Sequence, residues 1–230
     1  MQEYPLSNSL KINEMFETIQ GEGSFTGMPA IFIRLQGCPV GCPWCDTKHT
    51  WEINPEREQS VQQVLVKQAP DDSWFSETAD GILRLFATQG YLAKHVVITG
   101  GEPAMYDLRP LTSVLIDAGY SVQIETSGTF EILVDDKTWV TLSPKVNMQG
   151  GYEIVDQALA RADEIKHPIA MLKHVEELDA LLARPATNPA AQIFLQPISQ
   201  QKRATDLAVA TCIQRNWRLS LQTHKYIGIE

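Results

Sequence analysis

The sequence predicts an α/β fold in which a mostly parallel sheet forms an incomplete, open barrel. Apolar strand-like segments alternate with amphipathic helical segments through most of the 230 residues, which is typical of a parallel sheet with helical crossovers. We count about six convincing strand–helix units, fewer than the roughly eight that close a full barrel. No linker, internal repeat or low-complexity stretch interrupts the pattern, so we expect a single domain over residues 1–230.

Strands are predicted where short apolar runs are bounded by polar or glycine-rich residues. These segments lie at 30–35 (AIFIRL), 95–99 (HVVIT), 121–126 (SVQIET), 139–143 (WVTLS), 192–195 (QIFL) and 217–222 (WRLSLQ). Most of them are followed by a loop rich in Gly, Pro, Ser or charged residues. Functional loops of such folds gather at the carboxyl ends of the strands, so we expect one site there.

Helices are predicted from capping residues and from apolar side chains at helical spacing. The segments are 60–69, 76–90, 107–119, 175–182 and 204–215. Ser60 and Ser76 are the expected caps of the first two, although Gly81 weakens the second. Asp107 is the expected cap of the third, which Gly119 ends. The polar stretch 53–72 predicts a surface excursion.

Composition and charge narrow the function classes. The net charge is −9, so general attraction to a nucleic-acid backbone is not expected, and any link to nucleic acid is metabolic. No run of 18 apolar residues is present, and the N-terminus lacks the basic flank and apolar core of a signal peptide. We therefore expect a cytoplasmic protein, in which clustered cysteines are metal ligands or redox groups more often than disulfides.

Three of the four cysteines share the loop QGCPVGCPWCDT, with the spacing C-x3-C-x2-C. A structural zinc site usually needs a fourth protein ligand, for which His49 and Asp46 are the nearby candidates. An iron–sulfur cluster on three thiolates leaves one iron open for a substrate or cofactor. Spacing alone favours the cluster and leaves zinc open. Cys212 lies in a helical pattern and is expected to be a buried small hydrophobe.

The flanks of this loop carry a resemblance to a known superfamily. An aromatic residue, Trp44, precedes the last cysteine of the loop, and GGEP follows at 100–103. Together these resemble the two signature motifs of radical S-adenosylmethionine (SAM) enzymes. The segments INEMFETIQGEG, PAIFIRLQGC, CDTKHTW, VVITGGEP, QIETSGT and SPK are similar to 7-carboxy-7-deazaguanine synthases, from about Ile12 to the C-terminus. Residues 1–11 are read as an N-terminal extension without an assigned role.

The resemblance implies an activity and its cofactors. Members convert 6-carboxy-5,6,7,8-tetrahydropterin to 7-carboxy-7-deazaguanine with loss of ammonia, a step toward the queuosine base of tRNA. They depend on Mg²⁺ and use SAM catalytically on a [4Fe-4S] cluster. One electron entering the cluster cleaves SAM to methionine and a 5′-deoxyadenosyl radical. The resemblance also implies a homodimer, a flavodoxin-like electron donor and a barrel of the radical SAM type.

Site residues follow from the resemblance, motif by motif. The implied cluster ligands are Cys38, Cys42 and Cys45, and Thr47 is the implied Mg²⁺ ligand. The implied SAM-binding residues are Gly100, Gly101, Glu102, Pro103, Glu125, Ser127, Ser143, Pro144 and Lys145. The implied substrate-binding residues are Ile19, Gln20, Gly21, Arg34 and Thr99. Glu22 is a second candidate for the pterin, Asp46 can assist the Mg²⁺ site, and His224 is the one histidine that stands at a strand end.

Each of these residues also has a purely structural interpretation. Arg34, in an apolar strand, could form an ion pair with a core carboxylate instead of binding a substrate carboxylate. Thr99 could be a β-branched strand residue, and Asp46–Thr47 could form an ordinary turn. Two alternative functions also remain: an activating enzyme that takes hydrogen from a glycine of a partner protein, and a zinc-stabilised binding module without catalysis.

Overall fold

One sheet organises the computed structural model, which describes residues 9–198 and 201–229. Its strand order is β3-β1-β2-β4-β5-β6-β7-β8-β9. The strands are β1 (Ser9–Ile19), β2 (Pro29–Leu35), β3 (Phe75–Thr78), β4 (His95–Gly100), β5 (Ser121–Thr126), β6 (Trp139–Leu142), β7 (Glu164–Ile169), β8 (Gln192–Pro197) and β9 (Arg218–Leu219). β1 runs antiparallel to β2 and β3, and every later pair is parallel. The fold is thus a single-domain α/β fold with a mostly parallel sheet, as predicted.

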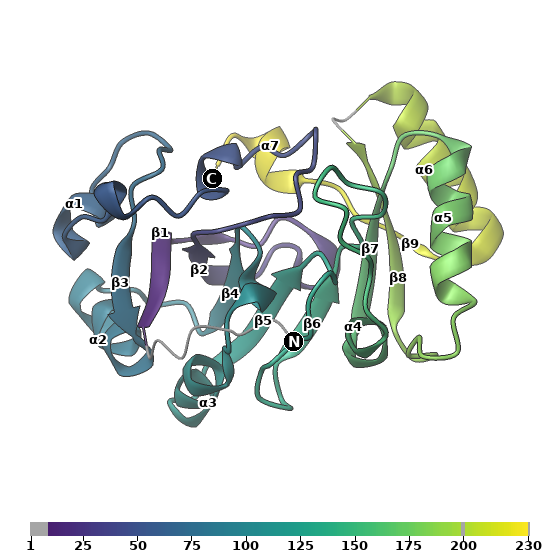
Figure 1. Ribbon diagram of the computed structural model, residues 1–230. Helices are drawn as coiled ribbons and strands as arrows, with labels where there is room; N and C mark the ends of the chain where they lie inside the picture. Colours follow the sequence, from purple (N-terminus) through teal and green to yellow (C-terminus); the bar gives the residue numbers. More distant parts are fainter. Residues whose placement is uncertain (1–8, 199–200, 230) are drawn as a thin grey trace.

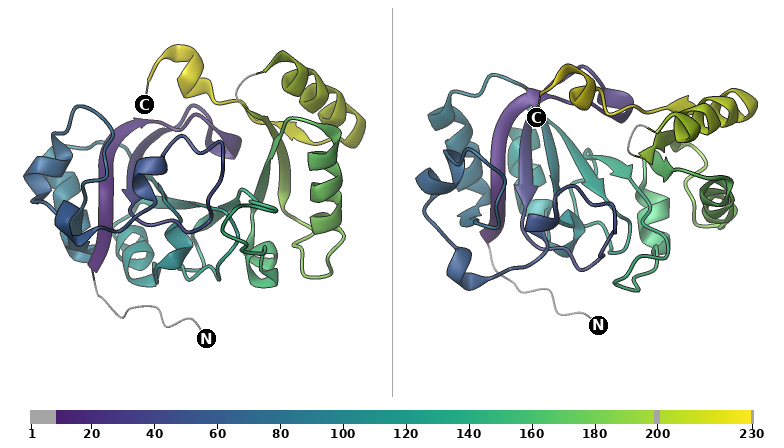
Figure 2. Two further views of the ribbon diagram at one scale, coloured as in Figure 1. Left: turned by 45° about the horizontal axis from the view of Figure 1, so that its top comes forward. Right: turned by 90° about the horizontal axis from the view of Figure 1, so that it is seen from above.

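The longer helices cover one side of this curved sheet and leave the other side to loops and the short α7 (Figures 1 and 2). The helices are α1 (Val61–Leu65), α2 (Ala79–Gln89), α3 (Arg109–Asp117), α4 (Asp156–Arg161), α5 (Leu172–Leu182), α6 (Lys202–Arg215) and α7 (Thr223–Ile227). The cysteine loop and α7 lie together at the top of Figure 1, away from the outer helices. β3 and β9 are the two edges of the described sheet, so the strand order does not close on itself.

Alternation along the strands separates a helix-facing core from an interior face. In β2, Ile31, Ile33 and Leu35 are fully buried in the hydrophobic core, and burying each contributes roughly 1.5–3 kcal/mol. The intervening Phe32 and Arg34 point to the other face, because successive side chains of a strand alternate. This face becomes the wall of the cavity described below.

Several predicted elements shift in the structure. Ser60 caps α1 as predicted, with a capping box to Gln63, but the helix ends at Leu65. The helix expected from Ser76 instead begins after Thr78, whose side chain accepts a hydrogen bond from the Gly81 amide. Ser76 belongs to β3, because this segment pairs with β1.

Other boundaries were also wrong. Asp107 lies one residue outside the N-cap of α3, Leu108, and binds the Arg109 amide. The predicted last strand, 217–222, is reduced to Arg218–Leu219, because the chain then turns into α7. β1, β3 and β7 were not predicted, and neither were α4 and α7. Residues 9–11 of the expected N-terminal extension belong to β1, and the rest of it lies outside the described residues.

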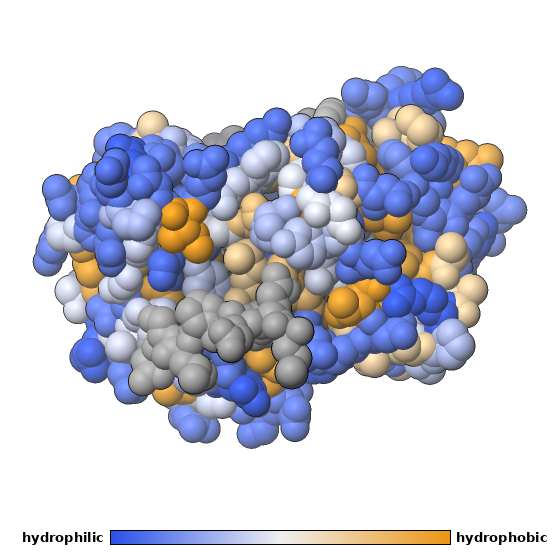
Figure 3. Space-filling model, viewed as in Figure 1, coloured by the Kyte–Doolittle hydropathy of each residue, from blue (hydrophilic) through white to orange (hydrophobic). Residues whose placement is uncertain are grey.

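The surface shown in Figure 3 is mostly hydrophilic, and its hydrophobic residues form small separate patches. The excursion at 53–72 is largely exposed, as predicted, and Arg57 and Asp72 pair across it. Within residues 9–198 and 201–229, no helix has the length and apolar character needed to cross a bilayer.

Candidate active site

A cavity of about 490 Å³ opens at the carboxyl ends of the parallel strands. Its walls come from the turn after β1, the inner face of β2, the cysteine loop, the ends of β4 to β8, and α7. All five predicted substrate residues line it, together with Cys38, Cys42, Cys45 and Thr47. So do seven of the nine predicted SAM residues: Gly100, Gly101, Glu102, Glu125, Ser127, Ser143 and Lys145. The fold therefore brings these sequence-distant motifs into one place.

Pro103 and Pro144 are the two predicted SAM residues that do not line this cavity. Pro103 is buried in the turn after Glu102. Pro144 borders a smaller crevice of about 160 Å³ beside Trp44 and His167.

The three loop cysteines are free thiols that face the cavity. Burial, with smaller contributions from Glu102 and the other two cysteines, raises the pKa of Cys38 to about 12, and burial also raises that of Cys42. A thiolate is therefore costly here unless a cation binds it. The loop is shaped by its own backbone, in which the Cys45 amide donates to the Cys42 carbonyl at 3.1 Å.

The donor set suits a cluster better than a single metal ion. Within the described part of the chain, no three His, Cys, Asp or Glu side chains are grouped to hold one ion. A structural zinc site takes four protein ligands on one ion, whereas a [4Fe-4S] cluster takes one thiolate on each of three irons and leaves the fourth iron open. The candidate fourth zinc ligands are also directed elsewhere: His49 lies 4.0 Å from Glu14, and Asp46 pairs with Lys225 at 3.1 Å. Cys212 lies outside the cavity and donates to the Arg218 carbonyl.

The GGEP turn is packed directly against the start of the cysteine loop. The Gly101 amide donates to the Leu35 carbonyl at 3.1 Å, and the Glu102 amide donates to the Gly37 carbonyl at 2.8 Å. A Cβ atom on Gly101 would lie 2.1 Å from the Gly37 oxygen, so only glycine permits this approach. The Glu102 carboxylate accepts hydrogen bonds from Thr126 and from the Ser127 amide, which fixes the turn to the end of β5.

The SPK segment contributes a buried amine. Lys145 donates to the carbonyl and the hydroxyl of Ser143, at 2.9 and 2.6 Å. Burial lowers the pKa of Lys145, which lies near Cys42, Glu102 and Glu125. The ammonium is thus held at the wall between the cysteine loop and β5.

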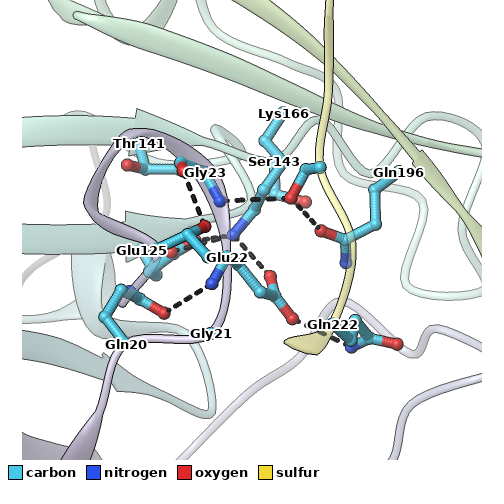
Figure 4. Close-up of polar contacts among 12 residues, drawn as sticks. Gln20, Gly21, Glu22, Gly23, Glu125, Thr141, Ser143, Lys166, Gln196 and Gln222 are labelled. Carbon is cyan, nitrogen blue, oxygen red and sulfur yellow. Dashed lines mark hydrogen bonds and ion pairs between the residues drawn. The ribbon is translucent and has the colours of Figure 1, made fainter. Parts of the chain in front are cut away.

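A buried ion cluster, which the sequence did not predict, also lines the cavity (Figure 4). Lys166, only 3% exposed, donates to Glu22 at 2.6 Å and to both oxygens of Glu125 at 2.8 Å. Glu22 also accepts from Gln222 of the segment before α7. Burial alone would raise the pKa of Glu22, but Lys166 outweighs it and lowers that pKa to about 2. Burial, with Glu22 and Glu164 nearby, raises the pKa of Glu125 to about 7 despite Lys166.

The predicted substrate residues near this cluster differ in how far their side chains are already bonded to other protein groups. Gln20 donates to Gln123 at 3.2 Å and accepts from the Glu22 amide, so its side chain is already engaged within the protein. Arg34 pairs through Nε with Glu14 at 2.6 Å, which is the structural alternative raised by the sequence, and it still lines the cavity. Thr99 is the register partner of Arg34 on β4.

The segment around α7 forms part of the cavity mouth. Thr223 binds the Gly21 carbonyl through both its amide and its hydroxyl, at 3.0 Å each. His224 packs against Gly21 so closely that a Cβ atom there would lie 2.3 Å from Nδ1. Burial, more than any nearby charge, lowers the pKa of His224. Lys225 of α7 pairs with Asp46 at 3.1 Å, and the hydroxyl of the next residue, Thr47, lies 3.5 Å from the Cys45 sulfur.

Comparison with known proteins places this site in a family, although no protein-family model matches the chain. The 7-carboxy-7-deazaguanine synthase of Escherichia coli K12 is 58% identical over 218 residues, 95% of this chain and 98% of the relative. The synthases of Buchnera aphidicola and Synechocystis sp. are 44% and 36% identical, over 95% and 97% of this chain and 98% and 95% of theirs. The crystal structure of QueE from Escherichia coli superposes with a TM-score of 0.91 at 56% identity, over 95% of this chain and 96% of that one. The chain is therefore an enzyme of the 7-carboxy-7-deazaguanine synthase family.

Proposed function

We propose that the enzyme converts 6-carboxy-5,6,7,8-tetrahydropterin to 7-carboxy-7-deazaguanine with release of ammonia, by Mg²⁺-dependent radical SAM chemistry. The observation that carries this proposal is one cavity with two differently equipped walls. Three free cysteines and the GGEP turn line one part of the cavity, which we call the cofactor wall, and the Glu22–Lys166–Glu125 cluster lines another, which we call the substrate wall. A cofactor that generates a radical and a small polar substrate can then meet between them.

On the cofactor wall, Cys38, Cys42 and Cys45 would hold the [4Fe-4S] cluster. When bound, the cluster and SAM supply the one-electron chemistry that starts the rearrangement. The backbone of Gly100 and Gly101 would approach the methionine part of SAM, and Ser127, Ser143 and Lys145 would bind its remaining polar groups. The Glu102 side chain is used to fix the turn, which supports a role for its backbone.

On the substrate wall, Arg34 and Thr99 are adjacent across β2 and β4 and would hold the substrate carboxylate. Arg34 uses Nε for Glu14, and within the described residues its other guanidinium nitrogens have no hydrogen-bond partner. Because the Gln20 side chain is engaged, the backbone of 19–21 would read the pterin edge. We place Glu125 with the substrate and not with the SAM ribose, because it shares Lys166 with Glu22.

Mg²⁺ would bind at Thr47, beside the cysteine loop, with Asp46 in support. A single hydroxyl is a weak ligand for Mg²⁺, which usually keeps waters and takes oxygens from the substrate. We therefore infer that metal and substrate carboxylate bind together.

The proposal includes the setting of the enzyme. The open sheet supports an incomplete barrel of the radical SAM type, formed by the whole chain as one domain. We further propose that the enzyme works in the cytoplasm in queuosine biosynthesis, as a homodimer that receives electrons from a flavodoxin-like donor. It would bind neither membrane nor nucleic acid directly.

The direct test is turnover. The reconstituted enzyme is incubated anaerobically with SAM, a reductant, Mg²⁺ and the carboxytetrahydropterin, and the products are separated by chromatography. We expect 7-carboxy-7-deazaguanine and ammonia in equal amounts. SAM cleavage without the deazaguanine product would contradict the assigned substrate, and absence of iron and sulfide would return the cysteine loop to a structural zinc site.

A further inference from the structure

Gln123 lies one layer below the cavity and has no role in the function proposed above. It is on β5, two residues before Glu125, so both side chains project from the inner face of that strand. Gln123 is fully buried, whereas Glu125 lines the cavity. A buried amide with an unpaired donor or acceptor is costly, so the partners of Gln123 show what this side chain holds in place.

The Gln123 amide has four polar neighbours. Its oxygen lies 3.2 Å from Gln20 Nε2 and 3.1 Å from His95 Nε2. Its nitrogen lies 2.8 Å from the Thr141 hydroxyl and 3.2 Å from Glu125 Oε1. A side-chain amide offers two donor hydrogens and two acceptor lone pairs, so this one is fully used. One buried side chain therefore joins β4, β5, β6 and the turn after β1.

The direction of these hydrogen bonds follows from one group, the Glu22 backbone amide, which can only donate. It donates to the Gln20 oxygen at 3.1 Å, so Gln20 Nε2 faces Gln123 and donates to its oxygen. The nitrogen of Gln123 therefore faces Glu125 and donates to it. Because the Gln123 oxygen also faces His95, the Nε2 atom of that imidazole must carry a proton.

His95 is itself held at the start of β4, away from the cavity mouth. Its Nδ1 lies 2.8 Å from the Ser121 hydroxyl, which can donate to it. The ring of Phe25, from the turn after β1, packs against the imidazole with the ring centroids 4.4 Å apart. His95 is buried between these neighbours. The surroundings therefore fix both the position of the ring and the tautomer that donates to Gln123.

We propose, resting on the function proposed above, that Gln123 is a positioning residue that holds Gln20 and Glu125 in the arrangement that binds the pterin. His95 fixes the Gln123 amide in the orientation that this requires. Gln20 in turn holds the turn after β1 through the Glu22 amide, and Glu125 belongs to the ion cluster of the substrate wall (Figure 4). Without the Gln123 amide both cavity residues lose a partner at once. The cofactor wall, where SAM would bind, does not depend on these bonds.

The first experiment measures binding of the pterin and of SAM to Gln123→Met, which keeps a side chain of similar volume and removes all four hydrogen bonds. Calorimetry is done anaerobically on the reconstituted enzyme with Mg²⁺ and without a reductant, so that no turnover occurs. The dissociation constant for 6-carboxy-5,6,7,8-tetrahydropterin should rise about tenfold or more, because two cavity residues lose a hydrogen-bond partner. The dissociation constant for SAM should change by less than about twofold.

The matched control is Gln157→Met, which removes another glutamine amide that is bonded at both ends. Gln157 lies on α4, away from the cavity, and binds the backbone of Ile132 at 2.8 and 3.1 Å. Its loss should lower stability in urea and leave both affinities unchanged. Unchanged pterin affinity in Gln123→Met would overturn the proposal. An equal loss of pterin and SAM affinity would also overturn it, because a general disturbance of the fold produces that result.

A second pair of variants decides the question if Gln123→Met does not fold. His95→Phe keeps a ring against Phe25 but offers no donor to Gln123, so pterin affinity should fall about fivefold. His95→Gln places an amide N–H near the position of the imidazole Nε2, so its affinity should stay within about twofold of the wild type. Equal pterin affinities in the two His95 variants would overturn the proposal.

The wild type separates this inference from the function on which it rests. A wild type that forms the deazaguanine while the affinities of these variants fail to change would contradict only the role of Gln123. A wild type that forms no deazaguanine would contradict the proposed function.

Discussion

The contact between Gly101 and the cysteine loop yields a sharp prediction for Gly101→Ala. The added Cβ would lie 2.1 Å from the Gly37 oxygen and 2.7 Å from its carbonyl carbon, where ordinary contact begins at 3.4 Å. Both atoms are backbone, so the two loops must separate by about 1.3 Å, because no side chain can rotate away. The hydrogen bonds from the Gly101 and Glu102 amides, at 3.1 and 2.8 Å, would weaken with that movement.

The expected loss of stability follows from these contacts. Overpacking costs about 1–3 kcal/mol, and each weakened hydrogen bond adds about 1 kcal/mol, which gives roughly 3–5 kcal/mol. A domain in the middle of the usual range of about 5–15 kcal/mol would still fold, with a urea midpoint lowered by about 1–2 M. Because Gly37 precedes Cys38, iron bound per chain after reconstitution should fall severalfold.

The assay pairs urea unfolding of the unreconstituted protein with iron and sulfide analysis of the reconstituted protein. Gly119→Ala is the control, because Gly119 has φ +86° but no atom within 4 Å of an added Cβ. It should lose about 1 kcal/mol from backbone strain and retain its iron. A Gly101→Ala protein with the wild-type urea midpoint and full iron content would refute the argument that this close approach shapes the cluster loop.

Five further variants test other parts of the account. Cys42→Ala should abolish SAM cleavage and Cys212→Ala should not; full activity in Cys42→Ala with an intact cluster would remove Cys42 from the ligands. Thr47→Ala should weaken the Mg²⁺ dependence of turnover and leave substrate-free SAM cleavage nearly unchanged, and an unaltered Mg²⁺ response would assign Thr47 to the turn alone. Arg34→Ala should lose product far more than abortive SAM cleavage; equal losses would leave Arg34 with only its structural ion pair. A carboxyl whose folded pKa is raised from 4.5 to about 7 loses stability as pH rises through that range, so Glu125→Gln should gain up to about 3 kcal/mol relative to the wild type between pH 4.5 and 7. A difference that stays constant with pH in urea unfolding would contradict the raised pKa.

The sequence predicted the helix-covered half of the fold better than the cavity-facing half. Strands such as β4 and β5 have apolar residues on the core face and few charges, so their pattern is evident. β7 reads EIKHPI, and it was missed because its inner face carries Glu164 and Lys166. β1 was missed because polar residues interrupt the apolar ones along this long strand. It also pairs antiparallel with β2, outside the parallel strand–helix alternation that was predicted.

The candidate site divides in the same way. Of the motifs that are local in sequence, the three loop cysteines and Gly100, Gly101 and Glu102 line the cavity, whereas Pro103 does not, and their roles stay predictions. Lys166 contacts Glu22 and Glu125, which lie 144 and 41 positions earlier in the chain, and no local sequence pattern predicts these contacts. Charged residues in an otherwise apolar strand were the one signal available, as Arg34 illustrates. The partner of Arg34, Glu14, became visible only with the pairing of β1 and β2.

The most direct test of the central claim follows the hydrogen at C6 of the pterin, the carbon that bears the carboxylate. The reconstituted enzyme is given substrate deuterated at C6, and 5′-deoxyadenosine, SAM and product are examined by mass spectrometry as SAM consumption is counted per product. We expect deuterium to enter SAM or 5′-deoxyadenosine and to return during turnover, with many products formed for each SAM consumed. If deuterium never enters either molecule, or if one SAM is consumed for each product, the proposed ring contraction by a catalytically used SAM is wrong.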